Sequence, residues 1–173
     1  MTTPRTAPEP VEAAERAIRR RLQDYCRGID RTDAELVASV YFADATDDHG
    51  SFKGLGTEFA LYVTEALRKR YDATQHMTSD PTIDFLDATT AHVETYVHAI
   101  HRGRNDDGAF LERFGGRYVD RFEYREGEWK IADRLVVHEW DAKEQLTLAF
   151  PEGRFTEGRR DRTDPSYPTR SGT

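Results

Sequence analysis

The sequence has a single cysteine, Cys26, among 173 residues. A disulfide within the chain is therefore excluded, and because one unpaired cysteine is typical of the reducing cytosol, we expect a cytoplasmic location. Long hydrophobic runs are missing as well. No stretch approaches the roughly 20 apolar residues of a membrane-spanning helix, and residues 1–10 lack the apolar segment of a signal peptide. We accordingly expect no membrane partner.

Positive charge is in deficit, with 25 Lys and Arg against 32 Asp and Glu and a formal net charge of −7. Phosphate binding requires a concentrated basic face, so nucleic acid is not expected as a partner. Two nucleotide and hydrolase motifs are also absent. Gly54 and Gly56 lack the third glycine and the preceding strand of a dinucleotide-binding loop, and there is no G-x-S-x-G elbow. Nucleotide binding and covalent catalysis therefore have little support.

Two groups of acidic and histidine residues match metal ligands only in part. His92, Glu94, Tyr96 and His98 alternate along one predicted strand and so share a face, but they follow no fixed ligand spacing. Residues 44–49 are acidic, yet they lack the glycine and the distal glutamate of a calcium-binding EF-hand loop. We expect no bound metal ion.

The first part of the chain has helical periodicity. Apolar residues recur every three or four positions from Val11 to Ile29, which predicts a helix with one buried face. The segment Thr-Arg-Asp-Glu at 32–35 has the pattern of a capping box and predicts a second short helix to about Tyr41. Residues 43–51 are expected to be turn-like, with one brief strand as an alternative, and a third helix is expected over about 57–70.

Near residue 72 the apolar period changes to two. Strands are expected at about 73–86, 89–102, 109–125 and 128–140. Because Pro81 lies inside the first of them, that strand is broken, bulged or at an edge of the sheet. Helices followed by an antiparallel meander predict one α+β domain over residues 11–145. Its three N-terminal helices would pack on a strongly curved antiparallel sheet and leave a cone-shaped cavity. We interpret residues 1–10 as a flexible arm and 146–173 as an extended tail.

Both faces of the predicted sheet carry apolar residues. One face of the strand over 109–125 is aromatic: Phe110, Phe114, Tyr118 and Phe122. We place three valines on the opposite face of the sheet: Val93, Val97 and Val119. Because a sheet with two apolar faces must cover both, we expect a homo-oligomer.

His76 is the strongest candidate for a base. A neutral imidazole can take a proton near pH 7, and an aspartate on its other nitrogen would fix the tautomer and stabilise the imidazolium. Asp30, which ends the first predicted helix, could be that aspartate. Two structural alternatives stay open: His76 could be a core histidine, and Asp30 could cap the second helix.

Tyr25 and Arg134 are weaker candidates. Tyr25 lies on the apolar face of the first helix and could be ordinary core. Arg134, near the end of the last predicted strand, could be the ion-pair partner of Glu94 or Asp120.

Three stretches carry a family resemblance. They are Tyr-Cys-Arg-Gly-Ile-Asp at 25–30, Thr-Gln-His-Met at 74–77, and Gly-Gly-Arg-Tyr-Val-Asp-Arg at 115–121 leading to Gly-Glu-Trp-Lys-Ile-Ala-Asp-Arg at 127–134. Over about residues 11–142 the chain resembles the SnoaL-like branch of the NTF2-like superfamily. The likeness extends to bile acid 7α-dehydratase, hexachlorocyclohexane dehydrochlorinase and scytalone dehydratase. In such enzymes a His–Asp dyad abstracts a proton and a leaving group departs from a neighbouring carbon, without a cofactor.

The resemblance implies the site residues. Four residues would be catalytic: His76, Asp30, Tyr25 and Arg134. Five would bind the substrate: His98, His138, Tyr118, Phe114 and Tyr96. It also implies a trimer rather than a dimer.

The expected function is thus a cofactor-independent lyase of dehydratase type, acting on a small apolar or polycyclic molecule. An isomerase or a polyketide-type cyclase with the same base is one alternative. A non-catalytic module that binds a small ligand is another, since the fold alone does not determine the reaction.

Overall fold

The computed structural model describes residues 11–147, 149–151 and 153–167, so the expected N-terminal arm and the last six residues of the tail lie outside the described chain. The helices are α1 (Val11–Asp30), α2 (Ala34–Ser39) and α3 (Gly56–Arg70). The strands are β1 (Tyr41–Asp48), β2 (Lys53–Leu55), β3 (Ala73–Thr78), β4 (Thr82–Phe85), β5 (Thr90–Asn105), β6 (Gly108–Arg125) and β7 (Glu128–Gln145).

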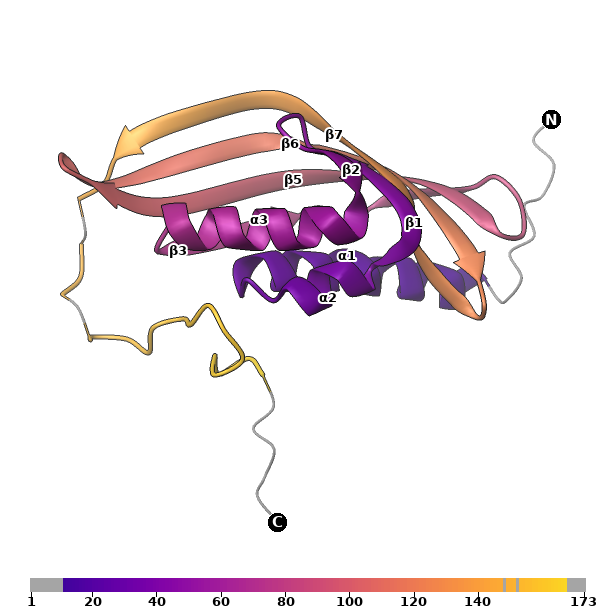
Figure 1. The fold of residues 1–173 in the computed structure, drawn as a ribbon, viewed down its shortest axis with the longest axis horizontal. Helices are drawn as coiled ribbons and strands as arrows, with labels where there is room; N and C mark the ends of the chain where they lie inside the picture. The colour runs from indigo at the N-terminus through magenta and orange to yellow at the C-terminus, as the bar shows by residue number, and fades with distance from the viewer. Residues whose placement is uncertain (1–10, 148, 152, 168–173) are drawn as a thin grey trace, which may run out of the picture.

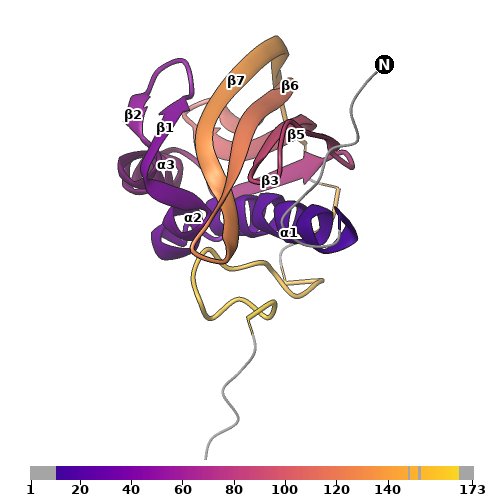
Figure 2. The same ribbon diagram turned by 90° about the vertical axis from the view of Figure 1, so that its right-hand side faces the viewer.

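The strands form one sheet in the order β2-β1-β7-β6-β5-β3, with β4 also paired to β5. All pairs are antiparallel except β1 and β7, which run parallel. The long strands β5, β6 and β7 curve over the three helices (Figure 1). Seen from the end, the sheet bends around them as an open cone (Figure 2). The predicted α+β cone is confirmed.

Helix α1 packs one apolar face into the cone. Ile18 and Ile29 are almost fully buried there, and burying a side chain of that size contributes about 1.5–3 kcal/mol. Gly28 lies where α2 crosses α1, because a Cβ atom at that position would come within 2.7 Å of the Val37 Cγ2 atom. The predicted helix is confirmed, and its last turn presents Asp30 to the sheet.

Helix α2 begins one residue later than a capping box at Thr32 would require. Asp33 is the N-cap and accepts a hydrogen bond at 3.2 Å from the Leu36 backbone N–H. Thr32 instead has a φ of +48°, in the left-handed region, because the chain turns sharply after α1. An N-cap residue needs an extended backbone, so the predicted capping box is wrong.

The segment expected to be turn-like is the strand β1. Tyr41 and Ala45 are buried, and Tyr41 lies opposite Ile131 of β7 in the parallel pairing. The strand is hard to see in the sequence because a buried carboxylate, Asp47, takes the place of an apolar residue on its inner side. The structure thus has a strand of 8 residues where the sequence predicts a turn-like segment or one brief strand.

The other strands agree with the predicted ones. Pro81 separates β3 from β4, and both pair with β5. The turn between β6 and β7 falls on Glu126 and Gly127, which have φ values of 54° and 86°. Two successive positive φ values are typical of the tight turns that join antiparallel strands.

The placement of the valines on the outer face is wrong for two of them. Val93 and Val97 are buried in the core, because they alternate in phase with the inward-facing Ala91 and Ala99 of β5. Val119 does lie opposite the inward-facing Tyr118 of β6. The larger exposed apolar side chains of the outer face come from other positions: Met77, Tyr96, Leu135 and Trp140.

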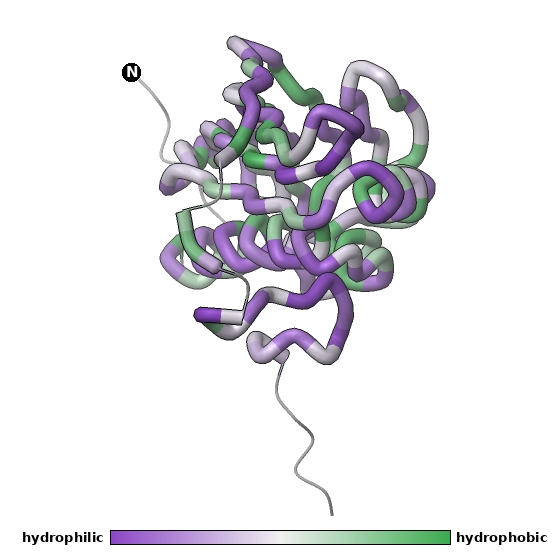
Figure 3. The backbone as a smooth tube through the Cα atoms, turned by 90° about the vertical axis from the view of Figure 1, so that its left-hand side faces the viewer, coloured by the Kyte–Doolittle hydropathy of each residue, from purple (hydrophilic) through white to green (hydrophobic). Residues whose placement is uncertain are grey.

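The tail returns beneath the helices (Figure 1) and is largely hydrophilic there (Figure 3). Arg162 pairs with Asp33 at 3.1 Å, and Asp164 pairs with Arg31 at 3.2 Å, so the tail covers the turn between α1 and α2. Within the described ranges, no helix combines the length and the apolar character that crossing a membrane requires.

Candidate active site

His76 and Asp30 form a hydrogen-bonded pair inside the cone. The His76 Nδ1 atom lies 2.8 Å from the Asp30 Oδ1 atom. The His76 side chain is 9% exposed and that of Asp30 is 13% exposed, so little water competes with the contact. Because Nδ1 is occupied by the carboxylate, Nε2 is the ring nitrogen left to exchange a proton with a bound molecule.

Three donors hold the Asp30 carboxylate. Besides the imidazole, the backbone N–H of His76 donates to Oδ2 at 3.0 Å, and the Thr74 hydroxyl donates to Oδ1 at 3.0 Å. All three come from β3, whereas Asp30 comes from the last turn of α1. The open structural alternative, Asp30 as a cap of α2, is therefore not what the structure has, since Asp33 fills that position.

A cavity of about 240 Å³ lies against His76. Six aliphatic and aromatic side chains form its apolar wall: Ile29, Val63, Leu67, Ala99, Phe114 and Val136. Five residues bring polar atoms to it: Tyr25, His49, His76, His101 and Tyr118. An engineered cavity of about 150 Å³ holds benzene, so this cavity suits a molecule of one or two rings.

Tyr25 faces the cavity, and Arg134 lies behind it. The Arg134 guanidinium carbon is 4.2 Å from the ring centroids of both Tyr25 and Tyr118. Its Nε and Nη2 atoms each donate to Asp120 at 2.7 Å, and both side chains of the pair are fully buried. The structure thus has the ion pair with Asp120 that was one of the open alternatives. Arg134 reaches the cavity only through the two tyrosine rings.

Burial and this arginine set the charge of the tyrosines. Burial raises the pKa of Tyr25 well above its ordinary value, although the charge of Arg134 opposes the shift. Burial likewise raises the pKa of Tyr118. Burial alone would lower the pKa of Arg134, but the Asp120 carboxylate holds it well above its ordinary value. Both tyrosines therefore stay protonated and act as hydrogen-bond donors beside a fixed cation.

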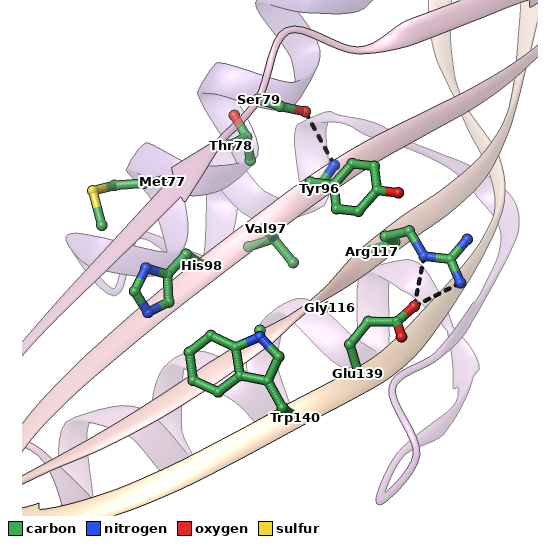
Figure 4. Close-up of a pocket in the computed structure, with 11 residues that line it drawn as sticks. Met77, Thr78, Ser79, Tyr96, Val97, His98, Gly116, Arg117, Glu139 and Trp140 are labelled. Atoms are coloured by element: carbon green, nitrogen blue, oxygen red, sulfur yellow. Dashed lines mark hydrogen bonds and ion pairs between the residues drawn. The ribbon is translucent and has the colours of Figure 1, made fainter.

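His98 and Tyr96 do not line this cavity. They alternate with the inward-facing Val97 and Ala99 on β5, so they lie on the outer face of the sheet. A larger hollow of about 920 Å³ opens there, with Trp140 at its edge, and in Figure 4 the helices lie behind the sheet as seen from it. We expected these two residues to contact a substrate beside His76. In the structure they lie on the other face of the sheet, away from the cavity that His76 lines.

The remaining expected binding residues divide in the same way. Phe114 and Tyr118 line the cavity. His138 lies near the rim: its ring centroid is 5.7 Å from that of Phe114, and its Nε2 atom is 2.9 Å from the Asp141 carboxylate. The pairing of β6 with β7 shifts by one residue here: Gly115 lies opposite Trp140, whereas Gly116 lies opposite His138.

Two histidines of the cavity were missed in the sequence. The ring centroid of His101 is 5.3 Å from that of His76, and burial lowers the pKa of His101 to about 4, so it is neutral at pH 7. His49 follows β1 and bonds to Asp47. The spacing of His101 to the inward-facing Ala99 could have placed it on the inner face, but the sequence carries no signal that brings His49 to the same cavity.

Neither a reactive thiol nor a group of metal ligands is found among the described residues of the site. Burial raises the pKa of Cys26 to about 12, which makes it a poor thiolate. In the part of the chain that the structure describes, no three His, Cys, Asp or Glu side chains are grouped so as to hold a metal ion. His92 and Glu94 lie on the outer face with His98. The histidine and tyrosine side chains that line the cavity are groups capable of acid–base chemistry.

Comparisons with known proteins identify the family and the fold. The sequence profile of the SnoaL-like domain matches residues 12–135. A protein of Novosphingobium aromaticivorans, provisionally named scytalone dehydratase, is 26% identical over 83% of this chain and 96% of its own, with a TM-score of 0.67. No curated protein matches the chain by sequence.

Two more distant structures share the fold. A hexachlorocyclohexane dehydrochlorinase is 22% identical over 82% of this chain and 95% of its own, with a TM-score of 0.71. The β subunit of a protein provisionally named aromatic-ring-hydroxylating dioxygenase, from Novosphingobium aromaticivorans, is 19% identical over 76% of this chain and 93% of its own, with a TM-score of 0.61. Proteins named as a dehydratase and as a dehydrochlorinase therefore share this fold with a protein named as the β subunit of a dioxygenase. Since the domain profile covers most of the chain, this protein belongs to the SnoaL-like family.

Proposed function

We propose that this protein is a cofactor-independent lyase of dehydratase type, in which His76 removes a proton from carbon. The observation that carries the proposal is the 2.8 Å contact between the His76 Nδ1 and Asp30 Oδ1 atoms, with His76 at the wall of an apolar cavity. A base held in one tautomer and shielded from water is what proton abstraction next to a carbonyl group requires. Tyr25 and Tyr118, kept protonated by burial, are available to donate to the developing enolate oxygen.

The cavity indicates the kind of substrate. Its volume of about 240 Å³ and its aliphatic and aromatic wall suit an apolar ketone of one or two rings rather than a larger polycyclic molecule. The acidic hydrogens of such a ketone are those on the carbon beside the carbonyl group. His76 would take one of them, and the electron pair left behind would expel a group from the next carbon.

Hydrogen exchange tests the base without knowledge of the natural substrate. The protein is incubated in deuterated water with α-tetralone, a two-ring ketone, and with cyclohexanone, and the loss of α-protons is followed by NMR. We expect the wild type to accelerate exchange and His76→Ala to abolish the acceleration. His92→Gln changes an exposed histidine on the outer face and should exchange as the wild type does. Exchange that survives in His76→Ala would contradict the proposal.

Two alternatives share part of this chemistry. An isomerase or cyclase would also exchange α-protons, and product analysis by NMR separates it from a lyase because no group leaves the substrate. A non-catalytic module has the support of the dioxygenase β subunit that shares the fold. It would bind the ketones without exchange, and it has no need of the buried pair of His76 and Asp30.

We also propose that the protein is a homo-oligomer, a trimer in preference to a dimer, joined through the outer face of the sheet. Tyr96 and Trp140 are 58% and 47% exposed at the hollow of about 920 Å³. Beside them Arg117 pairs with Glu94 and Glu139, so this surface carries charges of both signs with which a neighbouring subunit could pair. The preference for a trimer comes from the family resemblance. Light scattering that gives a monomer at micromolar concentration would reject this proposal.

A further inference from the structure

A second hollow adjoins the cavity at the open end of the cone. It lies between the end of α3, the start of β6 and the end of β7, which gather on one side of the molecule (left in Figure 1). We call this hollow the mouth; its volume is about 420 Å³, and Arg70, Glu112 and Lys143 line it. Phe114 and His101 line both the mouth and the cavity, so these two side chains divide two neighbouring spaces.

The register of the strands places the mouth one step from His76. Four residues opposite one another form the row of the base: His76, Ala99, Phe114 and Asp141. The next row toward the mouth has four more: Thr74, His101, Glu112 and Lys143. Residues two apart on a strand share a face and are separated by roughly 7 Å. A short carbon chain therefore spans the distance from a ring beside His76 to the mouth.

Glu112 lies at the centre of the mouth and is saturated with donors. The Arg70 Nη2 atom donates to both of its oxygens at 2.8 Å, and the Lys143 Nζ atom lies 3.1 Å from Oε1. The Tyr71 hydroxyl donates to Oε2. Burial alone would raise the pKa of Glu112, but these donors lower it to about 2, so the carboxylate stays charged. A carboxylate has about four acceptor sites, and these contacts use them.

The two cations of the mouth have donors to spare. In the described part of the chain, Arg70 and Lys143 each form an ion pair with Glu112 alone. A guanidinium has five N–H groups and an ammonium has three, so N–H groups remain on both side chains. The Arg70 and Lys143 side chains are 62% and 53% exposed, whereas that of Glu112 is 18% exposed. The cations thus face the open space, and the carboxylate lies beneath them.

Two more charged residues line the mouth, Asp141 and Arg113. Asp141 is 74% exposed and lies 2.9 Å from the His138 Nε2 atom, so water screens much of its charge. Arg113 alternates with the inward-facing Glu112 on β6, and its side chain pairs with Glu144 at 2.6 Å. The hydrogen-bonding groups left free at the centre of the mouth are therefore positively charged donors, which suit an anionic acceptor.

We infer that the mouth is the second half of the substrate site and binds a carboxylate, so that the substrates are ketones of one or two rings with a carboxylate on a short side chain. The inference rests on the proposed function of His76 as the base. The ring occupies the apolar cavity, and the chain passes beside Phe114. The carboxylate accepts charge-assisted hydrogen bonds from Arg70 and Lys143. Held at both ends, the ketone has one orientation relative to His76.

The test compares an acid with its ester on one carbon skeleton. Purified full-length protein is given α-tetralones that carry a propanoate chain on the aromatic ring, each paired with its methyl ester. Exchange of the ring α-protons in deuterated water gives kcat/KM, and titration calorimetry gives Kd. We expect the best acid to exceed its ester by about 10-fold or more in both quantities, which is the contribution of a hydrogen bond to a charged group.

Two variants should move the ratio of acid to ester in opposite directions. Lys143→Met removes the ammonium and keeps an unbranched side chain, so the ratio should fall by about 10-fold. Glu112→Gln removes the resident negative charge and frees Arg70 and Lys143, so the ratio should rise. Lys69→Met is the matched control, because Lys69 is an exposed residue of α3 that pairs with Glu65 outside the mouth. Its ratio should be that of the wild type. Since each ratio is taken within one variant, a general effect on folding cancels.

The outcomes separate this inference from the proposed function. Equal kcat/KM and Kd values for acid and ester in the wild type would overturn the carboxylate site, and exchange that is lost in His76→Ala would still support the base. A ratio that shifts the same way in Lys143→Met and Glu112→Gln would also overturn the site. If the acid binds more tightly than the ester but neither molecule exchanges protons, the site is supported and the proposed base is wrong.

Discussion

Replacing Asp30 by Asn tests the His–Asp pair with the smallest change in shape. The carboxylate accepts from the His76 Nδ1 atom, the His76 backbone N–H and the Thr74 hydroxyl, at 2.8, 3.0 and 3.0 Å. An amide has one oxygen and one NH₂ group. Either the NH₂ group faces the backbone N–H, or it donates to the imidazole and moves the ring proton to Nε2. The first arrangement leaves a buried donor unpaired, and the second removes the base.

The magnitudes follow from these two arrangements. One buried donor without a partner costs about 1–3 kcal/mol, and for a chain of this size Tm falls by roughly 2–4 °C per kcal/mol. Loss of the correct tautomer lowers the rate by about 100- to 10,000-fold, as general-base catalysis and an aspartate-oriented histidine imply. We therefore expect a modest loss of stability together with a large loss of proton exchange.

The assay is α-proton exchange of α-tetralone in deuterated water, with thermal melting of the same preparations. Asp33→Asn is the control for proton exchange, because Asn caps a helix as well as Asp does and Asp33 lies at the start of α2, outside the cavity. Its melting temperature also reports the loss of the ion pair with Arg162. If Asp30→Asn exchanges protons at the wild-type rate, the His–Asp pair is not the catalytic base and the reasoning fails.

Three further predictions concern stability. Asp120→Asn leaves the fully buried Arg134 guanidinium without its carboxylate partner. We expect the free energy of unfolding, measured by urea denaturation, to fall by about 3–5 kcal/mol, and an unchanged value would refute the buried pair. Burial holds the pKa of His101 at about 4 in the folded protein against 6.5 in the unfolded chain, so the unfolded chain binds the extra proton and Tm should fall between about pH 6.5 and pH 4, less steeply in His101→Gln. Arg160→Ala removes a tail guanidinium that donates to the carbonyls of Leu67 and Tyr71 at the end of α3. We expect about 1 kcal/mol of destabilisation with proton exchange retained, and loss of exchange would show that the tail acts on the site.

The sequence determined the elements whose signal is local. The apolar period of α1 and α3, the change of period near residue 72 and the break at Pro81 all depend on residues close together in the chain, and the structure agrees with each. The second helix was misplaced by a residue, because the conformation of Thr32 depends on the turn it must complete. The predicted dyad residues, His76 and Asp30, are in contact in the structure.

The tertiary structure decided which residues far apart in the sequence contact each other. Strand β1 is polar by sequence, and its carboxylate can be buried only because Tyr41 and His49 pair with it there. By sequence, Arg134 could have contacted a substrate or paired with an acidic side chain. It pairs with Asp120 because the two residues lie directly opposite each other on the neighbouring strands β6 and β7.

The tertiary structure also decided which face of each strand points inward and where His49 lies. Sequence alternation separates Tyr96 and His98 from Val97 and Ala99, but it does not say which set faces the helices. A strand period identifies two faces without choosing between them, and that choice comes from packing against α1 and α3. For the same reason the sequence by itself singled out His76 and Asp30 as candidates, whereas only the curvature of the sheet brought His49 to the same cavity.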